Sequence, residues 1–123
     1  MTFNSIYQYN FPTTIRFGLG AASELPAYLK QNGLKNPLIV TDAIVAQLPF
    51  FKKITANLTA NNLTAEVFSD IHKNPVKSDV YKGTDVWDNT GRDCIVGIGG
   101  GAALDVARAI VLRVHHREDL FKY

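Results

Sequence analysis

The sequence predicts an α/β fold: a Rossmann-like, mostly parallel sheet with helices on both faces. Short apolar runs typical of buried strands alternate with longer segments whose apolar residues recur at helical spacing. Right-handed crossovers between parallel strands would place those helices on both sides of the sheet. Three consecutive glycines, Gly99–Gly101, stand between one such strand and one such helix. The chain has 123 residues, which is enough for one domain with a core and too few for two.

The N-terminal residues predict a β-hairpin followed by a helix. Residues 3–20 are rich in aromatic and branched side chains, and Pro12 divides them into two short strands. Residues 21–30 then read as a helix with Ser23 as the N-cap. Pro26 falls in the first turn, where its missing N–H costs little.

Three strand–helix pairs follow the hairpin and the first helix. They comprise a strand at 37–42, helical residues 43–61 interrupted at Pro49, a strand at 64–69, a helix at 76–89, a strand at 95–98 and a helix to about His115. The chain stops where a further strand is due, so we expect the sheet to be incomplete. An uncovered sheet edge and apolar helix faces would favour a homo-oligomer.

Composition excludes several classes of protein. Hydrophobic residues make up 46% and charged residues 20% of the chain, as in ordinary soluble domains. The net charge of +2 and the absence of a basic run argue against nucleic acid as a partner. We expect no membrane span and no secretory signal. The single cysteine, Cys94, fits a reducing, cytoplasmic compartment and is expected to be a core residue.

The glycine turn is the strongest functional signal in the chain. A buried strand, a glycine loop and a helix N-terminus together form a ready phosphate site. Glycines let the backbone approach an anion with no Cβ in the way. The spacing Gly97-x-Gly99-x-x-Ala102 also fits the alanine-ending form of the dinucleotide fingerprint. Residues 1–123 are therefore expected to form a dinucleotide-binding domain.

The fingerprint normally includes an acidic residue about 20 positions downstream, at the end of the next strand. Glu118 and Asp119 lie near that offset, but no strand precedes them. A ribose-binding acid must then come from an earlier strand. Asp42 ends the strand at 37–42, on the side of the sheet where ligands bind. Its alternative role is to cap the helix that follows.

The histidines do not predict a metal site. His72 lies in a loop and is expected to be solvated rather than a ligand. His115 and His116 are adjacent, so on a helix their side chains point about 100° apart and share no ligand face. We assign no metal ligand and no catalytic residue within this chain.

Four segments, taken in order, resemble the N-terminal part of the iron-containing (group III) alcohol dehydrogenases. They are residues 11–20, residues 37–42, Asn74-Pro75 and residues 93–108. The resemblance covers nearly the whole chain but only the first part of a family member. It implies the NAD(P)-binding portion of a two-domain enzyme, whose second, helical domain would carry the metal and is absent here. Fe²⁺ or Zn²⁺ is thus expected only in a full-length enzyme.

The resemblance also implies a cofactor site. The glycines would hold the pyrophosphate, an aspartate would accept hydrogen bonds from the adenosine ribose, and an asparagine would lie near the cofactor. The residues that it assigns to cofactor binding are Asp42, Asn74, Gly97, Gly99, Gly100, Gly101, Ala102 and Asp105. The carboxylate of Asp42 favours NAD, with NADP as the alternative, because a 2′-phosphate would meet like charge.

Some of these positions have alternative readings or depart from the family. Asn74-Pro75 can simply start a turn. Asp105 is expected to orient the glycine loop or reach the cofactor, and its alternative role is to complement the helix dipole. Ala102 stands where the family usually has serine, which removes a hydroxyl donor worth about 1 kcal/mol of binding. Arg108 stands where the family has lysine and keeps the charge.

Three hypotheses follow. The leading one is the NAD(P)-binding portion of an oxidoreductase that interconverts an alcohol and an aldehyde or ketone by hydride transfer. Its metal would act as a Lewis acid from the missing domain, so this chain alone is expected to be inactive. The second is a glycerol dehydrogenase or a relative of dehydroquinate synthase. The third is a non-catalytic, oligomeric nucleotide-binding or interaction module.

Overall fold

A parallel sheet of four strands lies at the centre of the part of the chain that the structure describes. This structure is a computed structural model, and it describes residues 13–16 and 23–115. The strands are β1 (Thr13–Arg16), β2 (Pro37–Val40), β3 (Glu66–Phe68) and β4 (Cys94–Gly97). They lie in the order β1-β4-β2-β3, and every neighbouring pair is parallel. The predicted parallel sheet is confirmed, and among the described residues β1 and β3 are its edge strands.

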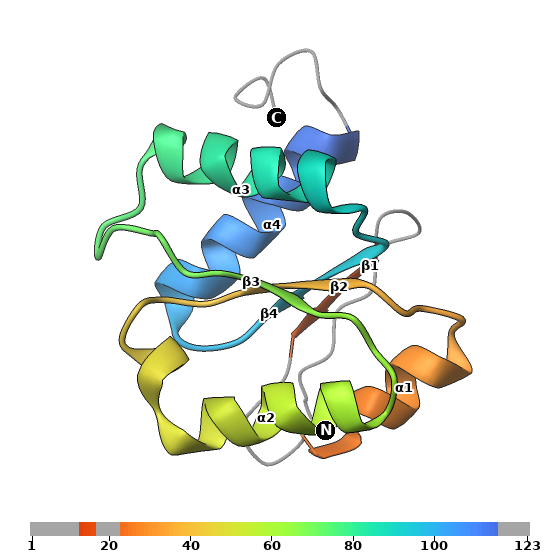
Figure 1. The fold of residues 1–123 in the computed structure, drawn as a ribbon. Helices are drawn as coiled ribbons and strands as arrows, with labels where there is room; N and C mark the ends of the chain where they lie inside the picture. Colours follow the sequence, from red (N-terminus) through yellow and green to blue (C-terminus); the bar gives the residue numbers. More distant parts are fainter. Residues whose placement is uncertain (1–12, 17–22, 116–123) are drawn as a thin grey trace.

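Helices cover both faces of this sheet, as predicted. They are α1 (Leu25–Gln31), the short 3₁₀ helix η2 (Val45–Gln47), α2 (Pro49–Ala60), α3 (Lys77–Thr90) and α4 (Gly101–His115). Figure 1 shows α1 and α2 on one side of the strands and α3 and α4 on the other. No helix in the described ranges is long and apolar enough to cross a bilayer.

The strands form two cores because their side chains alternate between the faces. Ile39 and Val96 pack with the α1 and α2 side, in one apolar cluster. Leu38 and Ile95 pack with the α3 and α4 side, in the other. All four residues are fully buried. A strand buried on both faces needs a continuous apolar run, which is the pattern that predicted these strands.

The N-terminal predictions are confirmed only in part. The strand at 13–16 forms and pairs in parallel with β4. The other predicted hairpin strand lies outside the described residues. Ser23 was expected to cap α1, but this prediction is wrong, since Glu24 is the N-cap. Ser23 and Glu24 already form a 3₁₀ turn, so neither has the extended backbone that a capping side chain requires. Pro26 lies in the first turn as predicted.

Two polar side chains join the strands at the amino end of the sheet. The Asp93 carboxylate accepts the N–H groups of Lys35 at 2.8 Å and Asn36 at 3.0 Å, just before β2 begins. The Arg92 guanidinium donates to the carbonyl oxygens of Pro37 and Thr64. These contacts fix where β2, β3 and β4 start, and so align the ends of the strands on the opposite side.

Candidate functional site

A pocket of about 390 Å³ lies at the carboxyl ends of β2 and β3, beside the start of α4. Open α/β sheets bind their ligands at this edge. The volume is within the range of small-molecule sites. The lining residues are Asp42, Ala43 and Ile44 after β2, Ile71, His72 and Lys73 after β3, and Ala102 of α4. The structure thus brings two of the predicted cofactor residues, Asp42 and Ala102, into one pocket.

The glycines beside this pocket have different physical roles. A Cβ atom on Gly97 would lie 3.0 Å from Leu104 Cδ2 and 3.1 Å from Ala107 Cβ, so Gly97 allows α4 to pack closely on β4. Gly99 has φ of +131°, a conformation that side-chain-bearing residues rarely adopt. Cβ atoms on Gly100 and Gly101 would meet nothing within 4 Å. The turn therefore presents open backbone at these last two positions.

The start of α4 completes an anion-binding geometry. The helix begins at Gly101, and the N–H of Leu104 bonds to the Gly100 carbonyl at 3.2 Å. The N–H groups before Leu104 have no acceptor within the helix, and the dipole adds partial positive charge there. Because Ala102 also lines the pocket, this helix end faces the space where a ligand would lie.

Asp42 uses the two oxygens of its carboxylate differently. Its Oδ1 accepts the Val45 N–H at 2.7 Å, so it supports the turn that leads into η2. Its Oδ2 would lie 3.7 Å from a Cβ on Gly99, and it accepts no hydrogen bond within the described ranges. One oxygen of the carboxylate is therefore structural, and the other is oriented toward the glycine turn.

Thr41 contributes a feature that the sequence did not reveal. The residue is fully buried, and its hydroxyl has no hydrogen-bond partner among the described residues. Its Oγ1 would lie 3.6 Å from a Cβ on Gly99. An unpartnered buried hydroxyl beside an open glycine turn suits a site that binds a polar ligand. Its only signal in the sequence is its place directly before Asp42.

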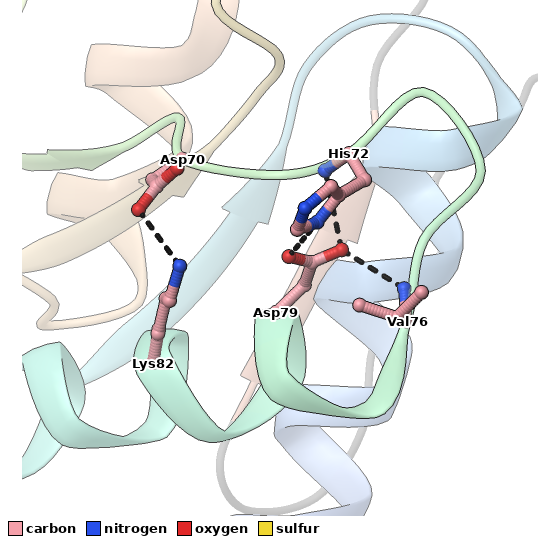
Figure 2. A network of polar contacts seen from close by, with 5 residues as sticks. All are labelled: Asp70, His72, Val76, Asp79 and Lys82. Carbon is pink, nitrogen blue, oxygen red and sulfur yellow. Dashed lines mark hydrogen bonds and ion pairs between the residues drawn. The ribbon is translucent and has the colours of Figure 1, made fainter.

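The loop between β3 and α3 forms the other wall of the pocket and is held by Asp79 (Figure 2). The Asp79 side chain is fully buried and accepts three hydrogen bonds. His72 supplies its Nδ1 at 2.7 Å and its backbone N–H at 3.2 Å, and Val76 supplies its N–H at 2.9 Å. Burial by itself would raise the pKa of Asp79, but the hydrogen bonds from Val76 and His72 outweigh it and keep this pKa below its usual value.

This network adds a contact that the sequence did not predict for His72. The imidazole is 58% exposed, as expected of a solvated loop histidine, and it is also bound to Asp79. A second ion pair, between Lys82 and Asp70 at 3.2 Å, joins the start of the same loop to α3 (Figure 2). Asp79 itself was missed by sequence reasoning. Asp79 lies three residues after Val76, which is the spacing at which an acid can bond back to the start of a helix. The contact with Val76 could therefore have been found from the sequence.

Two predicted residues lie apart from the pocket. Asn74 is exposed on the loop that Asp79 holds, next to the pocket residue Lys73, and does not line the pocket. Asp105 is 71% exposed, and its Oδ1 lies 3.4 Å from Arg108 Nη1. It belongs to a smaller hollow between α3 and α4 and lies beyond the first turn of α4. The glycine turn and Asp42 are therefore closer to the pocket than these two residues.

Cys94 is a core residue, and the described part of the chain holds no cluster of metal-ligating side chains. Cys94 is fully buried in β4, and burial strongly raises the pKa of its thiol, which confirms its role in the core. Within residues 13–16 and 23–115, no three His, Cys, Asp or Glu side chains gather where they could hold a metal ion.

Comparison with known proteins identifies the family. The family model named iron-containing alcohol dehydrogenase matches residues 12–123. This chain belongs to the iron-containing alcohol dehydrogenases. The resemblance noted from four sequence segments is thereby confirmed.

Individual relatives agree with this assignment. The chain is 32% identical over 104 residues to alcohol dehydrogenase 4 of Schizosaccharomyces pombe, which covers 85% of this chain and 25% of that protein. It is 35% identical over 101 residues to the NAD-dependent methanol dehydrogenase of Bacillus methanolicus, covering 82% of this chain and 26% of that protein. This chain spans about a quarter of the length of these curated relatives.

Solved structures match the fold of this iron-containing alcohol dehydrogenase chain. A 1,3-propanediol oxidoreductase aligns with a TM-score of 0.80 and 25% identity, covering 97% of this chain and 30% of that one. The sulfoacetaldehyde reductase of Bifidobacterium kashiwanohense, solved in complex with NAD⁺, aligns with a TM-score of 0.72 and 25% identity. It covers 98% of this chain and 31% of the reductase.

Proposed function

We propose that this chain is the NAD-binding portion of an alcohol dehydrogenase that has two domains. The observation that carries the proposal is the pocket at the carboxyl ends of the strands, bounded by Asp42 on one side and by Ala102 at the start of α4. A dinucleotide needs an anion site and a ribose site close together. The open glycines and the Oδ2 of Asp42 supply groups of these two kinds at neighbouring positions.

The assignment of roles follows from the chemistry of each group. The N–H groups at Gly100, Gly101 and Ala102 would bind the pyrophosphate, since the start of a helix favours negative charge. Asp42 would accept hydrogen bonds from the adenosine ribose through Oδ2. Asn74 and Asp105 are proposed to act from the rim of the site, because both lie outside the pocket lining.

Asp42 also determines which cofactor is preferred. A 2′-phosphate placed near its carboxylate would be repelled, so NAD is expected to bind more tightly than NADP. Lys73, on the opposite wall, is exposed and can offset only part of this repulsion. The NAD-dependent methanol dehydrogenase and the NAD⁺ complex of the sulfoacetaldehyde reductase support the same choice.

The reaction proposed for the whole enzyme is interconversion of an alcohol and an aldehyde or ketone. Bound NAD would supply the hydride chemistry, accepting hydride from the alcohol or, when reduced, returning it. The residues of this chain bind and orient the nucleotide. The family match and the relatives favour this reading over a glycerol dehydrogenase, a dehydroquinate-synthase-like enzyme or a non-catalytic module.

Calorimetric titration of NAD, and separately of NADP, tests the proposal. We expect saturable binding of NAD that is tighter than that of NADP. Asp42→Ala should weaken NAD binding by about 10-fold or more, since it removes a charged hydrogen-bond acceptor. Asp85→Ala is the matched control, because Asp85 is an exposed aspartate on α3, outside the pocket lining. Failure of the unaltered chain to bind either cofactor at millimolar concentration would contradict the proposal.

A further inference from the structure

The hydroxyl of Thr41 is buried and has no hydrogen-bond partner among the described residues. Thr41 follows β2, and its backbone N–H donates to the Phe68 carbonyl at 3.0 Å. The residue is thus fixed between the end of β3 and the turn from β4 to α4. Its Oγ1 is buried and has no partner within the described residues. Buried hydroxyls nearly always have partners, because one without a partner has lost its bonds to water and gained nothing.

The hydroxyl lies next to Gly99, the first residue of the glycine turn. Oγ1 would lie 3.6 Å from a Cβ on Gly99, so the α-carbon of Gly99 is its neighbour. Gly99 has φ of +131°, which a residue with a side chain would adopt only under strain. Because both flanking residues lack a Cβ, the peptide that links Gly99 to Gly100 can change its orientation more freely than an ordinary peptide.

Peptide geometry then connects Thr41 to ligand binding. In a planar trans peptide, the N–H and the C=O point in opposite directions. When the Gly100 N–H points at a phosphate, the Gly99 carbonyl must point away from that phosphate. The Thr41 hydroxyl is close enough to Gly99 to meet a carbonyl turned in this way, since its Oγ1 would lie 3.6 Å from a Cβ there.

We infer that Thr41 is a positioning residue for the nucleotide site. When a pyrophosphate binds, the Thr41 hydroxyl donates to the Gly99 carbonyl and so holds the Gly100 N–H toward the phosphate. This inference rests on the proposed function. In this role Thr41 acts on the ligand through the backbone of the turn. The serine that the family usually has at the position of Ala102 would instead contact the phosphate directly.

Thr41→Val is the test, because valine has nearly the shape of threonine and lacks the hydroxyl. Removing an unpartnered buried hydroxyl should stabilise the free chain, and we expect Tm to rise by about 2–6 °C. The same change removes a bond that forms only with ligand, so affinity for NAD and for ADP should fall by about 3- to 12-fold. Thr41→Ser retains the hydroxyl and should keep the affinity within about 2-fold. A purely structural residue would not change stability and binding in opposite directions.

Thr84→Val is the matched control. Thr84 is also buried, but its hydroxyl already donates to the Val80 carbonyl at 2.8 Å, on α3. This variant should not raise Tm, and NAD affinity should stay within about 2-fold of the unaltered chain.

The outcomes separate this inference from the proposed function. Normal NAD affinity in Thr41→Val, or a lowered Tm, would overturn the role of Thr41 while leaving the proposed function intact. If the unaltered chain binds neither NAD nor ADP, the proposed function fails, and the inference about Thr41 fails with it.

Discussion

At the scale of single residues, neighbouring glycines in one turn meet different demands. Gly99 is required because its backbone has φ of +131°, which residues with a side chain rarely adopt. Gly100 has no such constraint, and its role is to leave the space in front of the backbone open. The sequence indicated that both belong to a phosphate-binding turn. It could not separate their roles, because backbone angles and clearances depend on how α4 is placed against β4.

Alanine substitutions should separate these two demands. Gly99→Ala is expected to lower the free energy of unfolding by about 1–3 kcal/mol, because alanine is strained at this φ. Gly100→Ala should change stability by less than about 0.5 kcal/mol, since its Cβ meets nothing. It should nonetheless weaken NAD binding, because the Cβ would stand between the backbone and the phosphate. Urea denaturation and calorimetric titration of both variants measure these effects, and equal stability of the two would contradict the assignment.

At the scale of elements, the sequence predicted the strands and helices well and their connections poorly. Apolar spacing and proline positions located α2 and α3, because those signals are local. The cap of α1 was misplaced because Ser23 is already part of a 3₁₀ turn. The attachment of the loop to Asp79 was missed in part, since the contact with His72 depends on how the loop folds back.

Asp79→Asn tests how much the loop depends on this buried carboxylate. Asparagine has one acceptor oxygen where aspartate has two, so at pH 7 we expect a loss of about 1–3 kcal/mol in unfolding free energy. NAD affinity should fall as well, because the loop carries Asn74 and forms one wall of the pocket. Asp85→Asn, an exposed change on the same helix, should have little effect on either.

The pH dependence of stability gives the same variant a second readout. The pKa of Asp79 is lower in the folded chain than its ordinary value near 3.9. The carboxylate therefore stabilises the fold at neutral pH, and this contribution is lost as the pH falls from about 4 through the lowered pKa. Urea midpoints measured between pH 7 and pH 3 should decline less steeply in Asp79→Asn. An unchanged decline would mean that other groups dominate.

At the scale of the whole molecule, the polar contacts that join the strands and the proposed binding site lie at opposite ends of the sheet. Asp93 and Arg92 join the amino ends of the strands, and the pocket lies at their carboxyl ends. The sequence predicted a parallel sheet with helices on both faces, because alternation of strands and helices is a global pattern. It did not predict the strand order β1-β4-β2-β3, because the order is set by which strands pair across the sheet and not by any local run of residues.

Asp93→Ala should show this separation. The carboxylate bonds to two backbone N–H groups at the start of β2, so its loss is expected to lower the free energy of unfolding by about 1–3 kcal/mol. NAD affinity, measured at a temperature where the variant is fully folded, should stay within about 2-fold. A large loss of affinity would show that the two ends of the sheet are coupled.

Cys94 makes the opening of this sheet measurable without introducing another cysteine. It is the only cysteine in the chain, it is fully buried in β4, and β4 is an interior strand of the described sheet. A thiol reagent can react with it only when the interior strands separate from their neighbours, so the labelling rate reports the frequency of that event. If nucleotide binding slows the labelling, the degree of protection gives the binding free energy independently of calorimetry.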